Sequence, residues 1–463
     1  MIRRVLVANR GEIAVRVIRA CRSLGVESVL AVSVADRESL GARIADETVL
    51  LGPAPATESY LRPELVVAAA LGKGCDAVHP GYGFLAESAE LARLCAEHGL
   101  VFVGPGVEAL RLFGDKVTAR RHAVACGVPV LPASEPTTGG AEGLRAAEVV
   151  GFPLLVKASA GGGGKGMRRV ATADELPGAL ELAAAEAEAA FGSPTVYLER
   201  YVASGRHVEV QVVADAHGAV LHLGDRDCTV QRRHQKLVEE APAPGLPADV
   251  QEGLRASAVR LCQQAGYRGV GTVEFLVDVA AGEYYFLEVN PRIQVEHGVT
   301  ELVTGVDLVA TQLRVAAGEP LPFTQRDVVL RGHALECRIN AEDPAAGFRP
   351  SPGRLTAWRT PATGPSLRID THCVEGYLVP PYYDSLLAKV MTVAPTREQA
   401  IDLMDDALDE LVVAGVSTTR DLQRWILARP ELRELQVTTP WLDALLASGE
   451  GPVAVGAVAG ARS

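Results

Sequence analysis

Hydrophobic and polar residues alternate with two different periods in the N-terminal part of the chain. Apolar runs at 4–9 (RVLVAN) and 28–34 (SVLAVSV) predict buried strands, and the segments 11–25 and 61–74 have the spacing of amphipathic helices. Strands that alternate with crossover helices are typical of a parallel sheet. The first strand-to-helix turn, NRGE, has a single glycine. The pattern therefore predicts a Rossmann-like domain without a dinucleotide fingerprint.

Helical spacing returns near the other end of the sequence. Residues 396–415 begin with a capping-box pattern, Thr396 and Gln399, and end at Gly415, which predicts one helix. Turn-rich segments at 133–143 and 239–250 are expected to be exposed loops or subdomain edges.

A run of four glycines lies in the segment 158–167, ASAGGGGKGM, which also matches the dinucleotide pattern G-x-G-x-x-G. A dinucleotide loop must open a helix, but strand-like runs flank this one at 153–159 and 167–170. Because glycine also follows Lys165, the Walker pattern fails. The context predicts a hairpin whose backbone N–H groups close over nucleotide phosphates, with Lys157 facing an anion. The alternative is a flexible surface hairpin.

The segment 271–297 combines two strand-like runs with a turn, VAAG, between them. A hairpin here would bring Glu274 and Glu288 onto neighbouring strands. A period of two then places one polar series on one face, namely Glu288, Asn290, Arg292, Gln294 and Glu296. Carboxylate and amide oxygens suit Mg²⁺, and the arginine would meet a second anion. The alternative is the solvated face of an edge strand beyond Pro291.

Positive charge is concentrated in the segment 226–242, although the chain as a whole is acidic. The cationic side chains are Arg226, Arg232, Arg233, His234 and Lys236. A solvated basic run and an anion site are both compatible with this segment alone. Beside a phosphate-binding hairpin and a magnesium strand, the anion site is favoured.

The segment ALECRINAEDP shows a second strand-like alternation. It puts Glu336, Arg338 and Asn340 on one face, with Leu335, Cys337 and Ile339 on the other. Arg338 is therefore predicted to approach the anion site from a third region.

Composition restricts the class of protein further. With 463 residues, 48% hydrophobic and 22% charged residues, and a net charge of -12, we expect a globular enzyme of roughly two to four domains that does not bind nucleic acid passively. The eight cysteines contain no C-x-x-C pair, which favours reduced thiols. The first apolar run is too short for a signal peptide, and no stretch approaches the roughly 18 apolar residues of a membrane helix. A cytoplasmic protein is expected.

Together these motifs resemble the biotin carboxylase component of bacterial acetyl-CoA and other acyl-CoA carboxylases, an ATP-grasp enzyme. The resemblance extends from VLVANRGEIAVR to about residue 446 and includes HPGYGFLAES, GDKVTAR, KASAGGGGKGMR, RDCTVQRRHQK, EVNPRIQVEH, ECRINAEDP and PPYYDSLLAKV. It implies an α/β (α+β) fold with a Rossmann-like domain at 1–112, an ATP-grasp domain at 113–330, and a biotin-carboxylase-type C-terminal domain at 331–446. It also implies a mobile glycine-rich lid at about 131–203, and residues 447–463 are expected to be a disordered tail.

The resemblance implies a role for each residue that matches a family motif. The ATP contacts would be Lys116, Lys157, Gly163, Gly164, Glu199, Arg200, Tyr201, Val202, His207, Gln231, His234, Glu274, Leu276 and Glu288. Two Mg²⁺ or Mn²⁺ ions would be bound by Glu274, Glu288 and Asn290. Bicarbonate and biotin would meet Lys236, Arg292, Gln294, Val295 and Arg338, and catalysis would fall to Arg292, Glu296, Lys236 and Arg338.

The implied reaction is the ATP- and bicarbonate-dependent carboxylation of biotin. Glu296 would act as the general base that activates bicarbonate toward the γ-phosphate, giving carboxyphosphate. Carboxyphosphate would yield CO₂ and phosphate, the phosphate would take the ureido proton of biotin, and Arg338, assisted by Arg292, would stabilise the enolate. The implied partners are a biotin carboxyl carrier protein, carboxyltransferase subunits and a second copy of this chain; no nucleic acid and no membrane is expected.

Two further features of the sequence bear on this resemblance. Gly298 stands where the family usually has proline, so a looser loop beyond Glu296 is expected. None of the four methionines precedes a lysine, so the Ala-Met-Lys-Met biotinylation sequence is missing and the carrier must be a separate chain.

Several alternatives remain open at this point. The final acceptor could be acetyl-CoA, propionyl-CoA, pyruvate or urea. Another ATP-grasp ligase, a non-catalytic scaffold subunit and a nicotinamide dehydrogenase are the rival classes. ECRINAEDP and PPYYDSLLAKV argue against the first, the complete set of ligands argues against the second, and the context of the glycines argues against the third.

Overall fold

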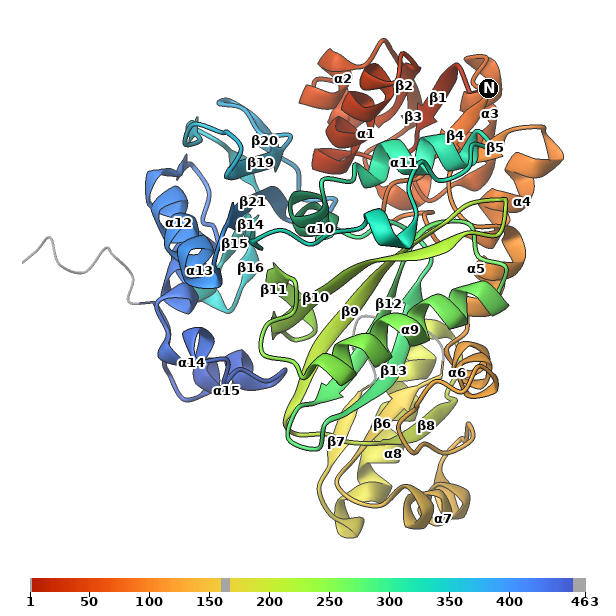
Figure 1. Cartoon of the computed structure of the whole chain (residues 1–463), viewed down its shortest axis with the longest axis vertical. Coiled ribbons are helices and arrows are strands. Elements are labelled where there is room, and N and C mark those ends of the chain that lie inside the picture. Colours follow the sequence, from red (N-terminus) through yellow and green to blue (C-terminus); the bar gives the residue numbers. More distant parts are fainter. Residues whose placement is uncertain (1, 160–166, 453–463) are drawn as a thin grey trace, which may run out of the picture.

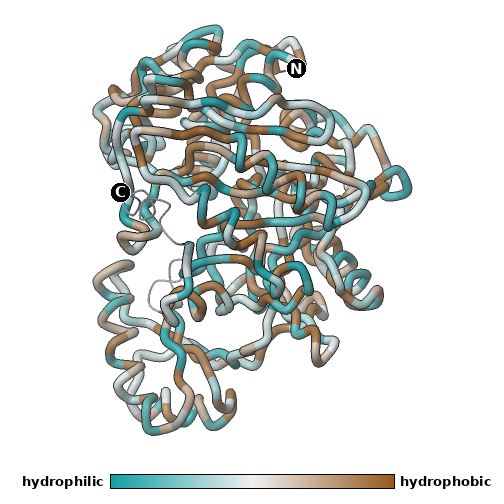
Figure 2. The backbone as a smooth tube through the Cα atoms, turned by 90° about the vertical axis from the view of Figure 1, so that its left-hand side faces the viewer, coloured by the Kyte–Doolittle hydropathy of each residue, from teal (hydrophilic) through white to brown (hydrophobic). Residues whose placement is uncertain are grey.

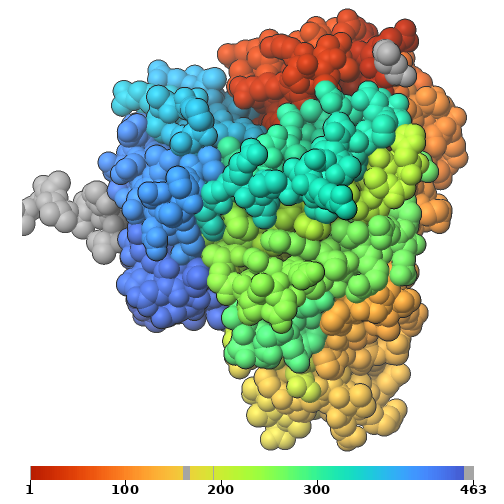
Figure 3. Space-filling model, in the orientation of Figure 1, coloured from red at the N-terminus to blue at the C-terminus, as the bar shows by residue number. Residues whose placement is uncertain are grey.

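The computed structural model describes residues 2–159 and 167–452. The N-terminal region (red in Figure 1) lies at one end of the molecule, a smaller region (yellow) lies at the opposite end, and the C-terminal region (blue) lies at one side. Figure 3 shows the C-terminal region against both the N-terminal and the central region. Along the tube in Figure 2, hydrophilic and hydrophobic segments alternate, as expected for elements with one buried face. The predicted α/β class is confirmed.

The N-terminal region is a parallel sheet of five strands in the order β3-β2-β1-β4-β5, covered by helices on both faces. Separate hydrophobic clusters lie on the two faces, with Val5 and Val7 in one and Leu6 and Ala8 in the other. Burial on both faces explains why these strands appear as continuous apolar runs. The strands are β1 Arg4–Val7, β2 Glu27–Ser33, β3 Glu47–Gly52, β4 Ala77–His79 and β5 Val101–Phe102, and the helices are α1 Gly11–Ser23, α2 Leu40–Ile44, α3 Pro63–Gly72 and α4 Ala89–Glu97. The next two helices, α5 Val107–Gly114 and α6 Lys116–Ala125, enter the hydrophobic cluster of the central sheet.

The central element is an antiparallel sheet of eight strands in the order β13-β12-β9-β10-β11-β14-β21-β19. On β9, Val208, Val210 and Val212 enter the hydrophobic cluster beneath α9, so the intervening polar residues face the other side. The strands are β9 Gly205–Ala214, β10 Val220–Arg232, β11 Gln235–Ala241, β12 Gly269–Asp278, β13 Glu283–Asn290, β14 His333–Asn340, β19 Leu367–Thr371 and β21 Leu386–Ala394; the helices are α9 Ala248–Gln264, α10 His297–Thr304 and α11 Leu308–Ala316.

This sheet continues through the expected domain boundary at residue 330. Strand β11 pairs with β14 in the register Glu239 opposite Glu336 and Val238 opposite Cys337. The region expected to be ATP-grasp and the region expected to be C-terminal therefore share one hydrogen-bonded sheet.

A separate sheet of three strands, in the order β7-β6-β8, forms the region that we call the lid. Its elements are β6 Leu154–Ala158, β7 Arg168–Val170, β8 Val196–Arg200, α7 Gly140–Val150 and α8 Leu176–Phe191. Antiparallel pairing of β6 with β7 confirms the predicted hairpin. The glycine run lies within residues 160–166, which are outside the described residues. The expected mobility of the lid tip concerns the same residues.

The C-terminal region packs its helices on β14 and β21. Thr396 caps α12 by accepting from the backbone N of Gln399, as predicted. The helix ends at Glu410 and not at Gly415, because Val412–Ala414 form β22 and pair with β18. The other elements are β15 Glu342–Asp343, β16 Arg349–Pro350, β17 Gly353–Arg354, β18 Ala357–Arg359, β20 Leu378–Val379, α12 Arg397–Glu410, α13 Arg420–Leu427, α14 Pro430–Arg433 and α15 Trp441–Ala447.

Two other expectations about loops need correction. The segment 239–250 is only partly a loop, since its first residues belong to β11 and its last to α9. The segment 133–143 likewise ends inside α7. Of the expected tail, residues 453–463 lie outside the described residues. Within the described part of the chain, no helix has both the length and the apolar composition needed to cross a membrane.

Candidate active site

A cavity of about 640 Å³ lies between the lid and the eight-stranded sheet. It gathers residues from the lid, from the β10–β11 turn, from β12 and β13, and from β14. The predicted site residues that line it are Lys116, Lys157, Glu199, Arg200, Tyr201, Val202, His207, Gln231, His234, Lys236, Glu274, Leu276, Glu288, Asn290, Arg292, Gln294, Val295, Glu296 and Arg338. Gly163 and Gly164, the two other predicted residues, lie outside the described part.

One part of this cavity, which we call the lid end, contains Lys116, Lys157, Glu199 and Glu288. Lys157 on β6 forms an ion pair with Glu199 on β8. Lys116 begins α6, and its Nζ lies 3.4 Å from Glu288 Oε2. Burial would lower the pKa of Lys157, but the Glu199 carboxylate outweighs this effect and raises it. Among the described residues, each lysine has one carboxylate partner that an anionic ligand could replace.

Apolar side chains form the adjoining wall of the lid end. They are Leu131, Leu155, Met167, Leu276 and Leu287. The chain then passes from the lid to the central sheet through residues 199–202, where the Tyr201 backbone N donates to Pro153 O over 3.0 Å. An apolar wall next to lysines suits a ligand that has a flat base at one end and phosphates at the other.

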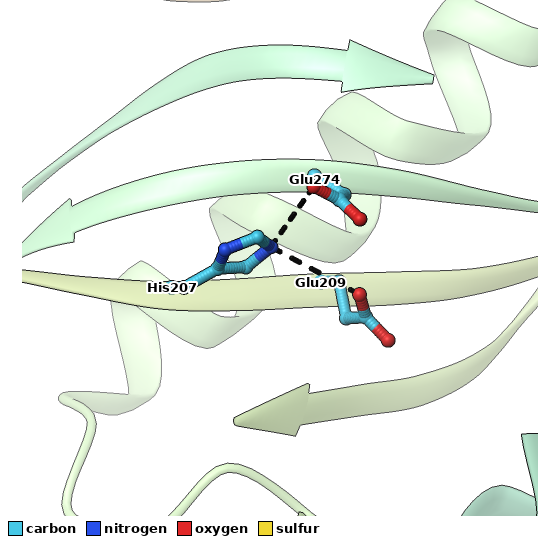
Figure 4. A group of neighbouring side chains, drawn as sticks. All are labelled: His207, Glu209 and Glu274. Carbon is cyan, nitrogen blue, oxygen red and sulfur yellow. Dashed lines mark ion pairs between the residues drawn. The ribbon is translucent and has the colours of Figure 1, made fainter. Parts of the chain in front are cut away.

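His207, Glu209 and Glu274 form a compact group on the neighbouring strands β9 and β12 (Figure 4). His207 Nε2 lies 3.0 Å from Glu274 Oε2 and 4.0 Å from Glu209 Oε2. Burial would lower the pKa of His207, but Glu274 outweighs it and raises the pKa. One ligand atom from each of the three lies within 4.8 Å of the others, so the group could hold a metal ion. Glu209 was not among the predicted residues.

The predicted magnesium ligands lie beside this group. Glu274 on β12 stands directly opposite Glu288 on β13, as the hairpin predicted. Asn290 Nδ2 donates to Glu274 Oε1 over 2.9 Å, and its Oδ1 accepts from Arg292. Two carboxylates and an amide oxygen at adjacent positions fit Mg²⁺ better than a set that includes an imidazole.

Lys236, on β11, is the centre of what we call the β11 end of the cavity. Its Nζ donates to Glu209 over 2.6 Å, to Glu274 over 2.9 Å and to Glu296 over 2.7 Å. Burial would lower the pKa of Lys236, but the three carboxylates together raise it well above its usual value. The ammonium is therefore charged and held from three sides.

Arg338 approaches the same place from β14, as the alternation of ALECRINAEDP predicted. It donates to Glu239 Oε1 over 2.6 Å and to Glu296 Oε2 over 2.9 Å. Burial alone would raise the pKa of Glu296, but Lys236, Arg338 and Arg226 outweigh it and lower the pKa. Glu296 is thus ionised and lies between two cations.

The alternating face expected from Glu288 to Glu296 changes character at Asn290, where β13 ends. The Arg292 backbone N donates to Asn290 O over 2.8 Å, so the chain turns here. Gln294 and Glu296 are only 3% and 2% exposed, which excludes the solvated edge strand. The turn and not a period of two brings them into the cavity, together with Val295.

The basic segment divides into two parts. Arg233, His234 and Lys236 line the cavity, and Arg233 and His234 have positive φ in the tight β10–β11 turn. Arg226 does not line it. Its side chain is fully buried and donates to Glu209 and to Gln294 Oε1, the latter over 3.1 Å. The prediction that Arg226 and Arg232 belong to the anion site is therefore wrong: Arg232 lies over the ring of Phe348, and Arg226 supports the residues that form the site.

Gly298 is fully packed, contrary to the expected looser loop. It lies in the first turn of α10 and is buried. A Cβ at this position would collide with Met391 Sδ and lie 3.5 Å from Glu336 Oε2. The Met391 side chain thus occupies the space that another residue would need.

A second cavity, of about 360 Å³, adjoins the first and shares Gln235, Val295 and Arg338 with it. Its other walls include Asn9, Arg10, Gly11, Glu12, Tyr82, Gly83 and Phe84. These residues lie in the strings ANRGE and HPGYGFLAES, but neither string has a charge pattern or ligand spacing that points to a binding role.

Family models match most of the chain. The biotin carboxylase N-terminal domain matches residues 1–110, the ATP-binding domain of the carbamoyl-phosphate synthase L chain matches 115–324, and the biotin carboxylase C-terminal domain matches 336–444. The biotin carboxylase of Pseudomonas aeruginosa is 51% identical over 426 residues, which cover 92% of this chain and 94% of the relative.

Two solved structures are similar over nearly their whole length. The beta-gamma-ATP complex of a biotin carboxylase from Campylobacter jejuni has a TM-score of 0.93 at 42% identity, and covers 96% of this chain and 99% of its own. The biotin carboxylase domain dimer of the 2-oxoglutarate carboxylase from Hydrogenobacter thermophilus, bound to MgADP, ADP and bicarbonate, has a TM-score of 0.92 at 43% identity, and covers 96% of this chain and 98% of its own. With its three matching regions, this chain belongs to the biotin carboxylase family.

Proposed function

We propose that this enzyme carboxylates biotin, carried on a separate protein, with ATP and bicarbonate as the other substrates. The observation that carries the proposal is the placement of Glu296 between Lys236 and Arg338, of which Arg338 lines both cavities. A carboxylate base with a cation on each side can bind a small anion and remove its proton.

ATP fits the lid end. Its base would lie against the apolar wall, and its phosphates would replace the carboxylate partners of Lys116 and Lys157. Glu274, Glu288 and Asn290 would hold magnesium, which when bound would offset charge on the phosphates. The two lysines assist the same transfer because electrostatic stabilisation dominates phosphoryl chemistry.

Bicarbonate fits the β11 end, where Lys236, Arg292 and Arg338 supply positive charge. Bound bicarbonate would compete with Glu296 for Lys236 and Arg338. As these cations turn toward the ligand, Glu296 loses part of their stabilisation and its pKa rises, which makes it a stronger base. Glu296 then takes the bicarbonate proton, and the bicarbonate oxygen attacks the γ-phosphate to give carboxyphosphate and ADP.

The second cavity provides the approach for biotin. Its shared residue Arg338 can contact both the bicarbonate-derived group and the ureido oxygen, where negative charge develops when the ureido nitrogen is deprotonated. Carboxyphosphate releases CO₂ and phosphate, the phosphate removes the ureido proton, and the nitrogen attacks CO₂. Closure by the lid would exclude water from the labile intermediate.

Acetyl-CoA carboxylase is the assembly we favour, but the acceptor is chosen by a carboxyltransferase outside this chain. The similar Hydrogenobacter domain belongs to a 2-oxoglutarate carboxylase, so one type of domain serves different acceptors. That domain forms a dimer, which supports a homodimer here. All eight cysteines are free and buried, as expected in the reducing cytoplasm.

The test is ATP cleavage by the purified chain. We expect ADP release that requires both bicarbonate and free biotin, and carboxybiotin as the product with labelled bicarbonate. ATP cleavage that ignores biotin and supports another carboxylate acceptor would instead identify a different ATP-grasp ligase.

A further inference from the structure

Lys389 is a cation in the interior of the molecule that takes no part in the chemistry described above. It lies on β21, between Arg338 of β14 and Asp370 of β19 in the sheet register. Its side chain has no solvent exposure. Burial of a charge is costly, so a lysine at such a position needs specific partners.

The shortest of its polar contacts is to the backbone. Lys389 Nζ donates to Val295 O over 2.7 Å. Its carboxylate partners are farther away, with Glu12 Oε1 at 3.3 Å and Asp370 Oδ2 at 3.8 Å. Asp370 is also bound by Arg368, through two hydrogen bonds.

Val295 stands at the centre of the proposed reaction. It lines both cavities, and the next residue is Glu296. The carbonyl of the preceding residue, Gln294, also has a buried partner, because His297 Nδ1 donates to Gln294 O over 2.7 Å. Two successive carbonyls of the loop that carries the base are thus fixed by buried side chains.

The same lysine joins this loop to the N-terminal region. Glu12, on α1, accepts a hydrogen bond from Tyr82 OH, and both residues line the second cavity. One ammonium therefore contacts the loop before the base and a carboxylate in the wall of the proposed biotin site.

We propose that Lys389 is a positioning residue that fixes the Val295 backbone, and through it the bicarbonate subsite and Glu296. This inference rests on the proposed function. Lys389 does not touch a substrate; without it the Val295 carbonyl is free to turn, and a displacement of the loop by about 1 Å can lower turnover by about a hundredfold.

The test compares two charge-balanced double variants. In Lys389→Met with Glu12→Gln, the charge of each partner is removed and the donor to Val295 O is lost. In Lys389→Gln with Glu12→Gln, the charges are equally balanced but an amide N–H donor remains near Val295. Both are compared with Arg397→Met with Glu240→Gln, which removes a buried ion pair between α12 and β11. The other polar partners of this pair are His333 and the carbonyls of Leu432 and Arg433, none of which belongs to the loop that carries Glu296.

For the methionine variant we expect the KM for bicarbonate to rise and kcat to fall, each by about tenfold or more, with the KM for ATP within about twofold of the native value. The glutamine variant should recover a large part of both losses, and the control should show neither. Thermal melting identifies any general loss of structure, which would raise both KM values together.

Native bicarbonate kinetics in the methionine variant would overturn the proposal, as would a folded glutamine variant that is as impaired as the methionine variant. Should the unmodified enzyme show no ATP cleavage dependent on bicarbonate and biotin, the proposed function itself fails. The two failures are therefore distinguishable.

Discussion

The two ends of the main cavity hold their positive charges in different ways. At the lid end, Lys116 and Lys157 each have a single carboxylate partner within the described part of the chain, and the Lys116 pair is about one third exposed. At the β11 end, Lys236 has three carboxylate partners and Arg338 has two, all buried. A single partner can be exchanged for a phosphate, whereas a shared buried network keeps its geometry before the substrate arrives.

The largest effect is expected from Glu296→Gln at the β11 end. The amide keeps the shape of the side chain but cannot accept the bicarbonate proton, so kcat should fall by about 10²- to 10⁴-fold while ATP binding is retained. Steady-state ADP release and nucleotide titration measure the two quantities. The exposed Glu283→Gln is the matched control. If Glu296→Gln retained most of the native turnover, Glu296 would not be the general base.

Truncation of one lysine at each end tests whether the lid end and the β11 end differ in their contribution to stability. Lys236→Met leaves three buried carboxylates without their shared cation and should lower the free energy of unfolding by about 3–5 kcal/mol. Lys116→Met removes one partly exposed pair and should cost no more than about 1 kcal/mol, while it weakens ATP binding. Urea denaturation of both variants gives the two values. Equal losses of stability would contradict the distinction between the two ends.

Glu336, buried on β14 opposite Glu239 of β11, differs from the carboxylates of the β11 end, and the pH dependence of stability should reveal this. Neither carboxylate oxygen has a hydrogen-bond partner among the described residues, and burial raises the pKa well above its usual value of 4.5. The folded protein therefore keeps a proton that the unfolded chain loses above about pH 4.5, so this residue makes stability fall as pH rises. Glu336→Gln should remove that slope and stabilise the protein by about 1–3 kcal/mol near pH 8, with little effect near pH 4. Parallel slopes for native and variant protein in denaturation curves across this range would show that Glu336 is ionised.

The smallest effect is expected at Gly298, behind the loop that carries the base. Glycine to alanine in a helix usually stabilises by about 1 kcal/mol, but here the new Cβ meets Met391, and overpacking costs about 1–3 kcal/mol. The net result should be a loss of about 1 kcal/mol, measured by thermal or urea unfolding. With Met391→Ala as the background, the same change should become stabilising. A gain in the native background would mean that the site can relax.

Local patterns predicted much of this site. The Glu274–Glu288 pair followed from a hairpin and a period of two, and Arg338 followed from the alternation on its strand. Arg226 was misjudged because the sequence displays its charge but not its burial, which results from the pairing of β10 with β9. Glu209 and Lys389 were missed for the same reason, since each acquires its role from a strand or loop that is distant in the sequence.

The end of α12 and the walls of the second cavity also could not be predicted without the tertiary structure. The spacing of 396–415 continues past Glu410, but β-branched Val412 and Val413 pair with β18 and end the helix. Tyr82 and Glu12 line a cavity only because the N-terminal region packs against β14 and β21. Neither contact leaves a local signal in the sequence.

The pairing of β11 with β14 also decides how this chain can be divided. The match to the ATP-binding domain ends at residue 324 and the match to the C-terminal domain begins at residue 336, which suggests a place to separate two modules. A cut there would leave β11 and β14 as unprotected edge strands, and each fragment would tend to aggregate or to associate with the other. The gap between the two matched domains is therefore not a boundary between independently folding units, and the two parts have to be produced and exchanged together.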